Sequence, residues 1–138
     1  MAHQTSDLPR LTSKAAFDEF KANAVKKWEA IWSGEKTVVS VGVGSSSIPV
    51  GALDVMAAFE AIAEKENLIV RKTGVDGADW TDVQVRVKRK DAPAIVYANV
   101  EPSDAKGIVA DKHRSKIIGV EGDEEFDGIK PLTSLPFY

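Results

Sequence analysis

The sequence predicts an α/β fold built around one mixed sheet. An apolar, β-branched run ends in a glycine- and serine-rich turn at residues 42–47, and a segment with helical periodicity follows it. This is the pattern of a strand, a turn and a helix, and a second apolar run at 68–72 completes a β-α-β unit. Further on, residues 83–88 alternate strictly between apolar and polar side chains, which predicts one strand of a hairpin.

Composition limits the size and kind of the protein. A chain of 138 residues with 43% hydrophobic and 28% charged residues is ordinary for one soluble domain with a real core. The net charge of -3 disfavours a general nucleic-acid binder, and no apolar run reaches the length of a membrane span. The absence of cysteine excludes disulfides and thiolate-held metals or clusters. We therefore expect a cytoplasmic protein without nucleic-acid partners or membrane insertion.

The chain before the first strand is expected to form an arm and one helix. Residues 1–12 are polar and predict an arm outside the core. From 13 to 33, aromatic and aliphatic residues recur at helical spacing, with Ser13 placed to cap the start. The apolar face of this helix predicts packing against the core or, alternatively, a surface for a partner.

The later elements follow one another at short intervals. In order, we expect a strand at 37–43, a helix from Pro49 or Gly51 to Glu66, a strand at 68–72, a loop at 73–82, hairpin strands at 83–88 and 94–98, and a helix opening at Pro102. From 119 to 138 the chain is acidic and predicts a surface tail, so 13–118 is the expected domain. This order fits a thioredoxin-like α/β sandwich with a four-stranded mixed sheet and one additional N-terminal helix.

The serine-rich turn is the first candidate for a ligand site. Gly-Val-Gly-Ser-Ser-Ser nearly completes a dinucleotide fingerprint, but the third glycine is replaced by Ser47. Arg71 and Lys72 stand where an acidic residue would hold the ribose. The backbone N–H groups of Ser45, Ser46 and Ser47, at the start of a helix, would still suit an anion.

No group of residues predicts catalysis. His3 and His113 lie at opposite ends of the chain, so a histidine metal site is not predicted. The serine turn departs from the nucleophile motif G-x-S-x-G, and the aspartates between 76 and 82 lack the terminal glutamate of a calcium loop. The basic residues at 86–90 predict a solvated face or a contact with the acidic tail. We expect no catalytic residue, no metal and no cofactor.

Several short segments, through their order and spacing, resemble a known family. They are Lys27–Trp32, Ile48–Ala52, Lys72–Gly74, Val96–Val100 with Pro102, and Leu135–Tyr138. They are similar to the thioredoxin-like 2Fe-2S ferredoxin domain at the N-terminus of the flavoprotein (NADH-binding) subunit of NAD-linked hydrogenases and NADH dehydrogenase-type complexes. The match covers most of the chain. The resemblance implies that the flavoprotein and iron–sulfur subunits of such a complex are the partners.

The resemblance fails where the cluster would be held. The first pair of cluster cysteines of the family aligns with Gly42 and Ser47, and the second pair aligns with Val75 and Asp79. Glycine and valine cannot bind iron, so electron transfer is not implied. We predict a non-catalytic subunit or domain that serves assembly or docking in an NAD-linked oxidoreductase complex. The alternative is a free-standing anion- or nucleotide-binding module that uses the serine turn.

A partner would be expected to contact exposed aromatic residues. Trp28 and Trp32 lie in the predicted N-terminal helix, Trp80 lies in a polar loop, and Phe137 and Tyr138 end the chain. Tryptophan and tyrosine are enriched among the residues that dominate binding energy. These five residues are therefore the predicted partner contacts.

Overall fold

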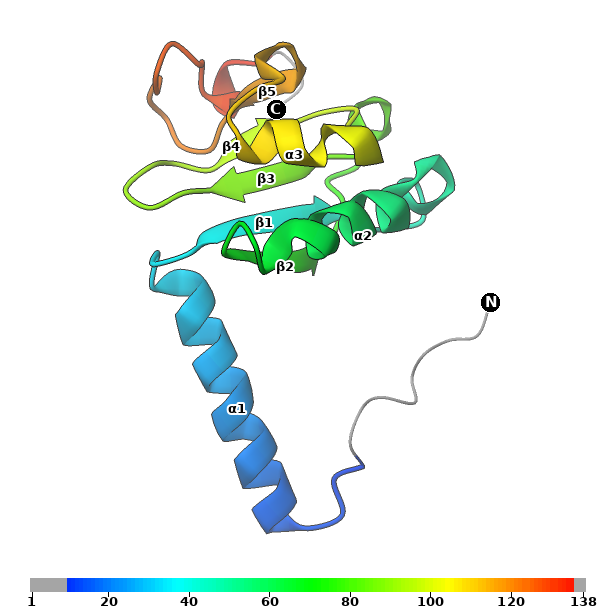
Figure 1. Ribbon diagram of the computed structural model, residues 1–138, viewed down its shortest axis with the longest axis vertical. Helices are drawn as coiled ribbons and strands as arrows, with labels where there is room; N and C mark the ends of the chain where they lie inside the picture. Colours follow the sequence, from blue (N-terminus) through cyan, green and yellow to red (C-terminus); the bar gives the residue numbers. More distant parts are fainter. Residues whose placement is uncertain (1–9, 136–138) are drawn as a thin grey trace. The chain divides into compact units, whose positions relative to one another are not determined.

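A computed structural model describes residues 10–135, so the predicted arm up to residue 9 and the predicted contacts Phe137 and Tyr138 lie outside the described residues. Internal contacts divide the chain into two units, Met1–Ser33 and Gly34–Tyr138. The first unit contains the helix α1, Lys14–Trp32 (Figure 1). As predicted, Ser13 caps this helix, because its Oγ accepts a hydrogen bond from the Ala16 N–H at 3.1 Å. No residue of α1 is buried.

The second unit is built on a mixed sheet with the strand order β2-β1-β3-β4-β5 (Figure 1). Its strands are β1 Thr37–Gly42, β2 Leu68–Thr73, β3 Val85–Lys88, β4 Ile95–Tyr97 and β5 Ile117–Val120. β1 and β2 are parallel, and the other neighbours are antiparallel. The predicted thioredoxin-like class is therefore confirmed. The predicted count of four strands is wrong, because Ile117–Val120 adds a fifth strand beside β4.

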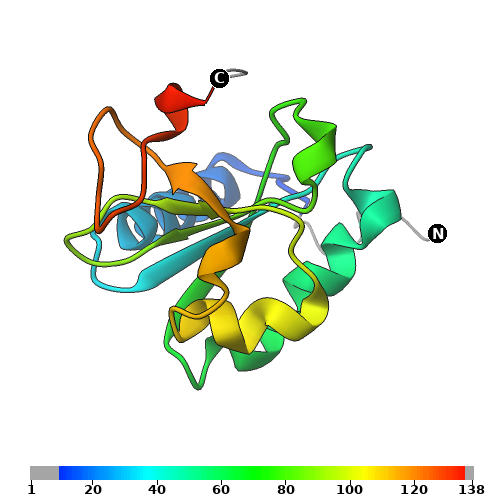
Figure 2. The same cartoon turned by 90° about the horizontal axis from the view of Figure 1, so that it is seen from above.

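Two helices cover the same face of this sheet (Figure 2). α2, Ala52–Ala63, buries Val55 and Phe59, and α3, Ala105–Val109, buries Ile108. The helix α2 is shorter than expected: Pro49 lies in a separate 3₁₀ turn, Ile48–Val50, and Gly51 has a left-handed φ of 100° between the turn and the helix. The strands contribute a valine-rich layer beneath the helices, which includes Val39, Val41, Val85, Val87 and Val120.

The segment after β5 folds back along the sheet. Val120 is buried in β5, and it forms an isolated parallel bridge with Pro131. Leu132 is also buried, and its side chain lies so close to Gly119 that a Cβ there would be 2.9 Å away. The region expected to be a tail from residue 119 therefore begins inside the sheet and contributes a buried leucine.

The basic residues of the β3–β4 hairpin have partners within the second unit. Arg86 pairs with Glu121 at 2.9 Å, so the predicted contact between the basic and acidic segments occurs for this residue. Arg89 Nη2 donates to the Ile108 carbonyl at 3.0 Å in the last turn of α3. Lys88 Nζ donates to carbonyls of its own hairpin. The hairpin is thus fixed to both α3 and the segment after β5.

Among the described residues, no helix has the length and apolar character needed to cross a membrane.

Candidate functional site

Two loops meet at the ends of the parallel strands β1 and β2, because parallel strands end at the same edge of a sheet. The Val43 N–H donates to the Thr73 carbonyl at 2.9 Å where the strands end. Beyond this bond, the side chain of Val75 lies against Gly44: a Cβ on Gly44 would lie 2.9 Å from one Val75 methyl group and 3.3 Å from the other. A Cβ on Gly42 would lie 3.7 Å from Val75. An apolar side chain therefore occupies the space between the two loops.

The serine turn closes on itself. Ser47 is fully buried, and its Oγ accepts a hydrogen bond from the Gly44 N–H at 2.8 Å. The N–H groups of Ser47 and Ile48 both donate to the Gly44 carbonyl. Ser45, Ser46 and Ser47 precede the 3₁₀ turn, and α2 begins only at Ala52. The structure therefore separates these serines from the N-terminus of α2, where the sequence pattern places them.

The four positions aligned with cluster ligands do not fit an iron–sulfur cluster. Gly42 ends β1 without a side chain, and Val75 offers only methyl groups. The Ser47 hydroxyl is buried inside its own turn. Asp79 is exposed at the start of the 3₁₀ turn Asp79–Thr81. Cluster binding needs four ligands that point to one centre, and at most two of these four residues have a side chain that carries oxygen.

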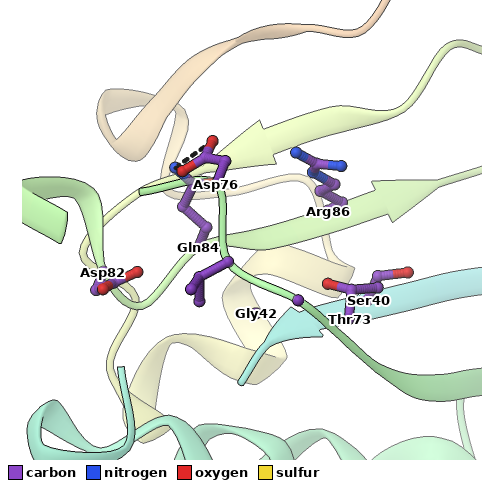
Figure 3. Close-up of a pocket in the computed structure, with 9 residues that line it drawn as sticks. Ser40, Gly42, Thr73, Asp76, Asp82, Gln84 and Arg86 are labelled. Atoms are coloured by element: carbon purple, nitrogen blue, oxygen red, sulfur yellow. Dashed lines mark hydrogen bonds between the residues drawn. The ribbon is translucent and has the colours of Figure 1, made fainter. Parts of the chain in front are cut away.

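A polar pocket lies beside these loops (Figure 3). Its lining residues are Ser40, Gly42, Thr73, Gly74, Val75, Asp76, Asp82, Gln84 and Arg86. Gln84 Nε2 donates to Thr81 Oγ1 at 2.5 Å and to the Asp76 carboxylate at 3.3 Å. Asp82 Oδ2 is buried and has no hydrogen-bond partner among the described residues. The pocket thus combines a guanidinium and two hydroxyls with carboxylates.

The sequence pattern did not single out Ser40, Gln84 or Arg86 as a group. The available signal was Ser40, a polar residue inside an apolar strand. Its neighbours across the sheet follow only from the strand register, which pairs it with Arg71 and Arg86. Among the described residues, no group of three histidine, aspartate or glutamate side chains could hold a metal ion.

A second polar cluster surrounds the buried carboxylate of Asp104. Asp104 Oδ2 accepts from Lys116 Nζ at 2.5 Å and from the Glu101 N–H at 2.8 Å, and His113 Nε2 lies 3.8 Å from the other oxygen. Burial raises the pKa of Asp104, but the hydrogen bonds from Lys116 and Glu101 and the nearby positive charges outweigh it and hold the pKa below its usual value. The ring of His113 also lies over Gly107 of α3. This cluster connects the start of α3 to Lys116, the residue directly before β5.

The predicted partner contacts that the structure describes are exposed. Trp28 is 57% exposed, Trp32 65% and Trp80 64%. The rings of Trp28 and Trp32 lie next to each other on α1, with centroids 5.4 Å apart. Their role as contacts stays a prediction.

The sheet order, with α2 and α3 on one face, is that of a thioredoxin-like fold (Figure 2). Similar solved structures agree: the wild-type thioredoxin-like 2Fe-2S ferredoxin from Aquifex aeolicus matches with a TM-score of 0.52 and 19% identity, over 62% of this chain and 98% of the ferredoxin. Another structure of a thioredoxin-like 2Fe-2S ferredoxin from that organism matches with a TM-score of 0.53 and 19% identity, over 67% of this chain and 99% of the ferredoxin. No protein-family model matches the sequence, and no curated protein matches it.

Proposed function

We propose that this chain is a non-catalytic thioredoxin-like subunit or domain that serves assembly or docking. Its partners would be the flavoprotein and iron–sulfur subunits of an NADH dehydrogenase- or hydrogenase-like complex. The observation that carries the proposal is that a ferredoxin-type fold is kept while all four aligned ligand positions, Gly42, Ser47, Val75 and Asp79, are unsuited to a cluster.

The replacement of the ligands is accompanied by local packing that favours a structural role. Val75 packs against Gly42 and Gly44 while 38% of it stays exposed, and the Ser47 hydroxyl is hydrogen-bonded inside its own turn. Both arrangements stabilise the loops without a metal, so the loop surface can persist as a surface for contact. The exposed tryptophans of α1 and Trp80 add large aromatic side chains of the kind that dominate interfaces.

The proposal is tested by capture of the tagged full chain from its native source, followed by mass spectrometry. We expect a flavoprotein and iron–sulfur subunits in a fixed ratio. A Trp28→Ala, Trp32→Ala variant should lose much of this capture, because two exposed aromatic anchors are removed from one helix. The matched control is Lys26→Ala, on another side of the same exposed helix. A chain that is captured alone would contradict the proposal.

A second measurement concerns the cluster. Anaerobic incubation of the purified chain with iron and sulfide should give no visible absorbance of a bound cluster, since the aligned residues lack thiolates. A stoichiometric 2Fe-2S spectrum would refute the cluster-less role.

The alternative function is an anion- or nucleotide-binding module that uses Ser45, Ser46 and Ser47. Titration calorimetry with NADH, flavins and phosphate separates the two functions. The docking role predicts no heat of binding for any of them. Saturable heat that is lost in a Ser46→Ala variant would favour the binding module, since the Ser46 hydroxyl is buried without a partner among the described residues.

A further inference from the structure

The two edges of the sheet differ in how their backbone is covered. Beyond β5, the returning segment occupies the edge: the Val120 N–H donates to the Lys130 carbonyl at 3.1 Å, and Val120 forms a bridge with Pro131. At the other edge, β2 has β1 as its only neighbour among the described strands (Figure 1). An edge strand with unpaired N–H and C=O groups is a template on which another strand can pair. The edge of the sheet that accepts a further strand is therefore β2.

One hydrogen bond shows which backbone groups of β2 face outward. The Thr73 carbonyl accepts from the Val43 N–H, directly after β1, so the backbone of Thr73 faces β1. In a parallel ladder, the N–H and C=O of one residue point to the same neighbour, and successive residues point to opposite sides. The outward-facing residues are therefore Leu68, Val70 and Lys72. Among the described residues, no backbone group forms a hydrogen bond with theirs on this outer side.

The sequence of β2 leaves most of this edge open. The strand contains neither proline nor glycine, and its register with β1 runs without a bulge. Proline, bulges and charged side chains are the features that close an edge to further strands. In β2 the charged residues, Arg71 and Lys72, stand only near its C-terminal end. A strand that pairs here must therefore accommodate cations at one end and apolar residues at the other.

The charges around β2 favour an antiparallel pair of identical strands. Its C-terminal end carries two cations, whereas the turn before it has a net charge of -1 from Glu64, Lys65 and Glu66. None of these five residues forms an ion pair with another described residue. Two antiparallel copies of β2 bring the cationic end of each strand next to the acidic turn of the other. A parallel pair would place like charges together, which is destabilising.

We propose that β2 pairs antiparallel with β2 of a second copy of this chain, centred on Val70. With this centre the outward-facing residues meet one another: Val70 lies opposite Val70 of the second copy, and Leu68 lies opposite Lys72. Each such pair exchanges two backbone hydrogen bonds. No like charges lie directly opposite each other, because Arg71 lies opposite Ile69. The result is a closed twofold dimer whose sheet continues through both copies. This dimer goes beyond the proposed docking function and does not depend on it.

Sedimentation velocity of the purified full chain tests the dimer, at about 10 µM to about 1 mM, the range of weak complexes. We expect the dimer fraction to rise with concentration. Val70→Pro removes the outward N–H but no hydrogen bond to β1, so it should weaken the dimer at least about tenfold. Circular dichroism and urea unfolding of this variant check that the monomer keeps its fold.

A pair of charge changes tests the same contact without altering the backbone of β2. Glu66→Lys gives the acidic turn a positive net charge beside the cations of the second copy, so the dimer should weaken about three- to tenfold. Lys72→Glu in the same chain removes much of this repulsion and should recover part of the loss. The matched control, Glu125→Lys, makes the same change at an exposed position after β5 and should alter the affinity less than about twofold.

Three results would overturn the proposal. They are a wild-type chain that stays monomeric over the whole range, a dimer that a folded Val70→Pro variant leaves unchanged, and no recovery when Lys72→Glu is added to Glu66→Lys. A last comparison concerns the exposed aromatic residues of α1. The Trp28→Ala, Trp32→Ala variant should remain dimeric, and its conversion to a monomer would assign the interface to α1 instead of β2.

Discussion

At the scale of single residues, the contact between Gly44 and Val75 explains how two loops stay together without ligands. Glycine at position 44 leaves room for the Val75 methyl groups, which would lie 2.9 Å and 3.3 Å from a Cβ at this position. Gly74, in the same pair of loops, has open space where its Cβ would be. The two glycines therefore differ in their tolerance of alanine, although both stand in loops after strands.

We expect Gly44→Ala to lower the free energy of unfolding by about 1–3 kcal/mol, because the added methyl group overpacks against Val75. Gly74→Ala should have no cost or stabilise by up to about 1 kcal/mol, since it restricts only the unfolded chain. Urea unfolding measures both. In the double variant with Val75→Ala, part of the loss at position 44 should be recovered. Equal effects of the two alanines would contradict the contact.

Asp104 gives the protein an acid-sensitive contribution to stability. Its pKa is lower in the folded chain than in the unfolded chain. Its contribution is therefore present above the unfolded value of about 3.9 and is lost as the pH falls through the lower folded value. Asp104→Asn should cost about 1–3 kcal/mol at pH 7, because the Lys116 ammonium loses its carboxylate partner.

The difference between wild type and Asp104→Asn in urea unfolding should shrink as the pH is lowered from 5 to about 2. Asp111→Asn serves as the control, because that carboxylate is exposed and pairs with Arg114 at 3.4 Å on the surface. It should change stability by less than about 1 kcal/mol at either pH. If Asp104→Asn lowered the free energy of unfolding equally at every pH, the charge of Asp104 would not be the source of its contribution to stability.

At the scale of elements, the local sequence pattern predicted most strands. It did not predict the strand that depends on pairing with a segment distant in sequence. Alternation and β-branched runs predicted β1, β2 and β3 to within about two residues. β5 was missed because it is short, contains Gly119 and precedes an acidic run, so no local signal marks it. Its pairing with β4 and the bridge from Val120 to Pro131 are formed by segments distant in sequence.

The candidate site was predictable only in part, for the same reason. The family resemblance aligned Gly42 and Val75 with cluster cysteines of the family. In the structure both residues line the same pocket. The row of Arg71, Ser40 and Arg86 depends on the register of three strands, and a shift by one residue would move each side chain to the other face. The sequence alone therefore does not show that these three side chains lie next to one another.

The separation into two units at the scale of the whole molecule has a consequence for stability. The hydrophobic core cluster draws only on residues of the unit Gly34–Tyr138, and no residue of α1 is buried. Burial of apolar surface is the main favourable term in folding, so α1 adds little to the stability of that core. Most of the stability of a helix in a protein comes from the packing of its apolar face, and α1 has exposed apolar residues that packing on a partner would cover.

We therefore expect a chain shortened to residues 34–138 to unfold cooperatively in urea, with a free energy of unfolding within about 1 kcal/mol of the full chain. Far-ultraviolet circular dichroism suits the comparison, because deletion of Trp28 and Trp32 alters the fluorescence signal. The full chain with Trp28→Ala and Trp32→Ala is the control and should match the wild type in stability, since both rings are exposed. A shortened chain that is several kcal/mol less stable would mean that α1 supports the core. The apolar face of α1 would then serve folding rather than a partner.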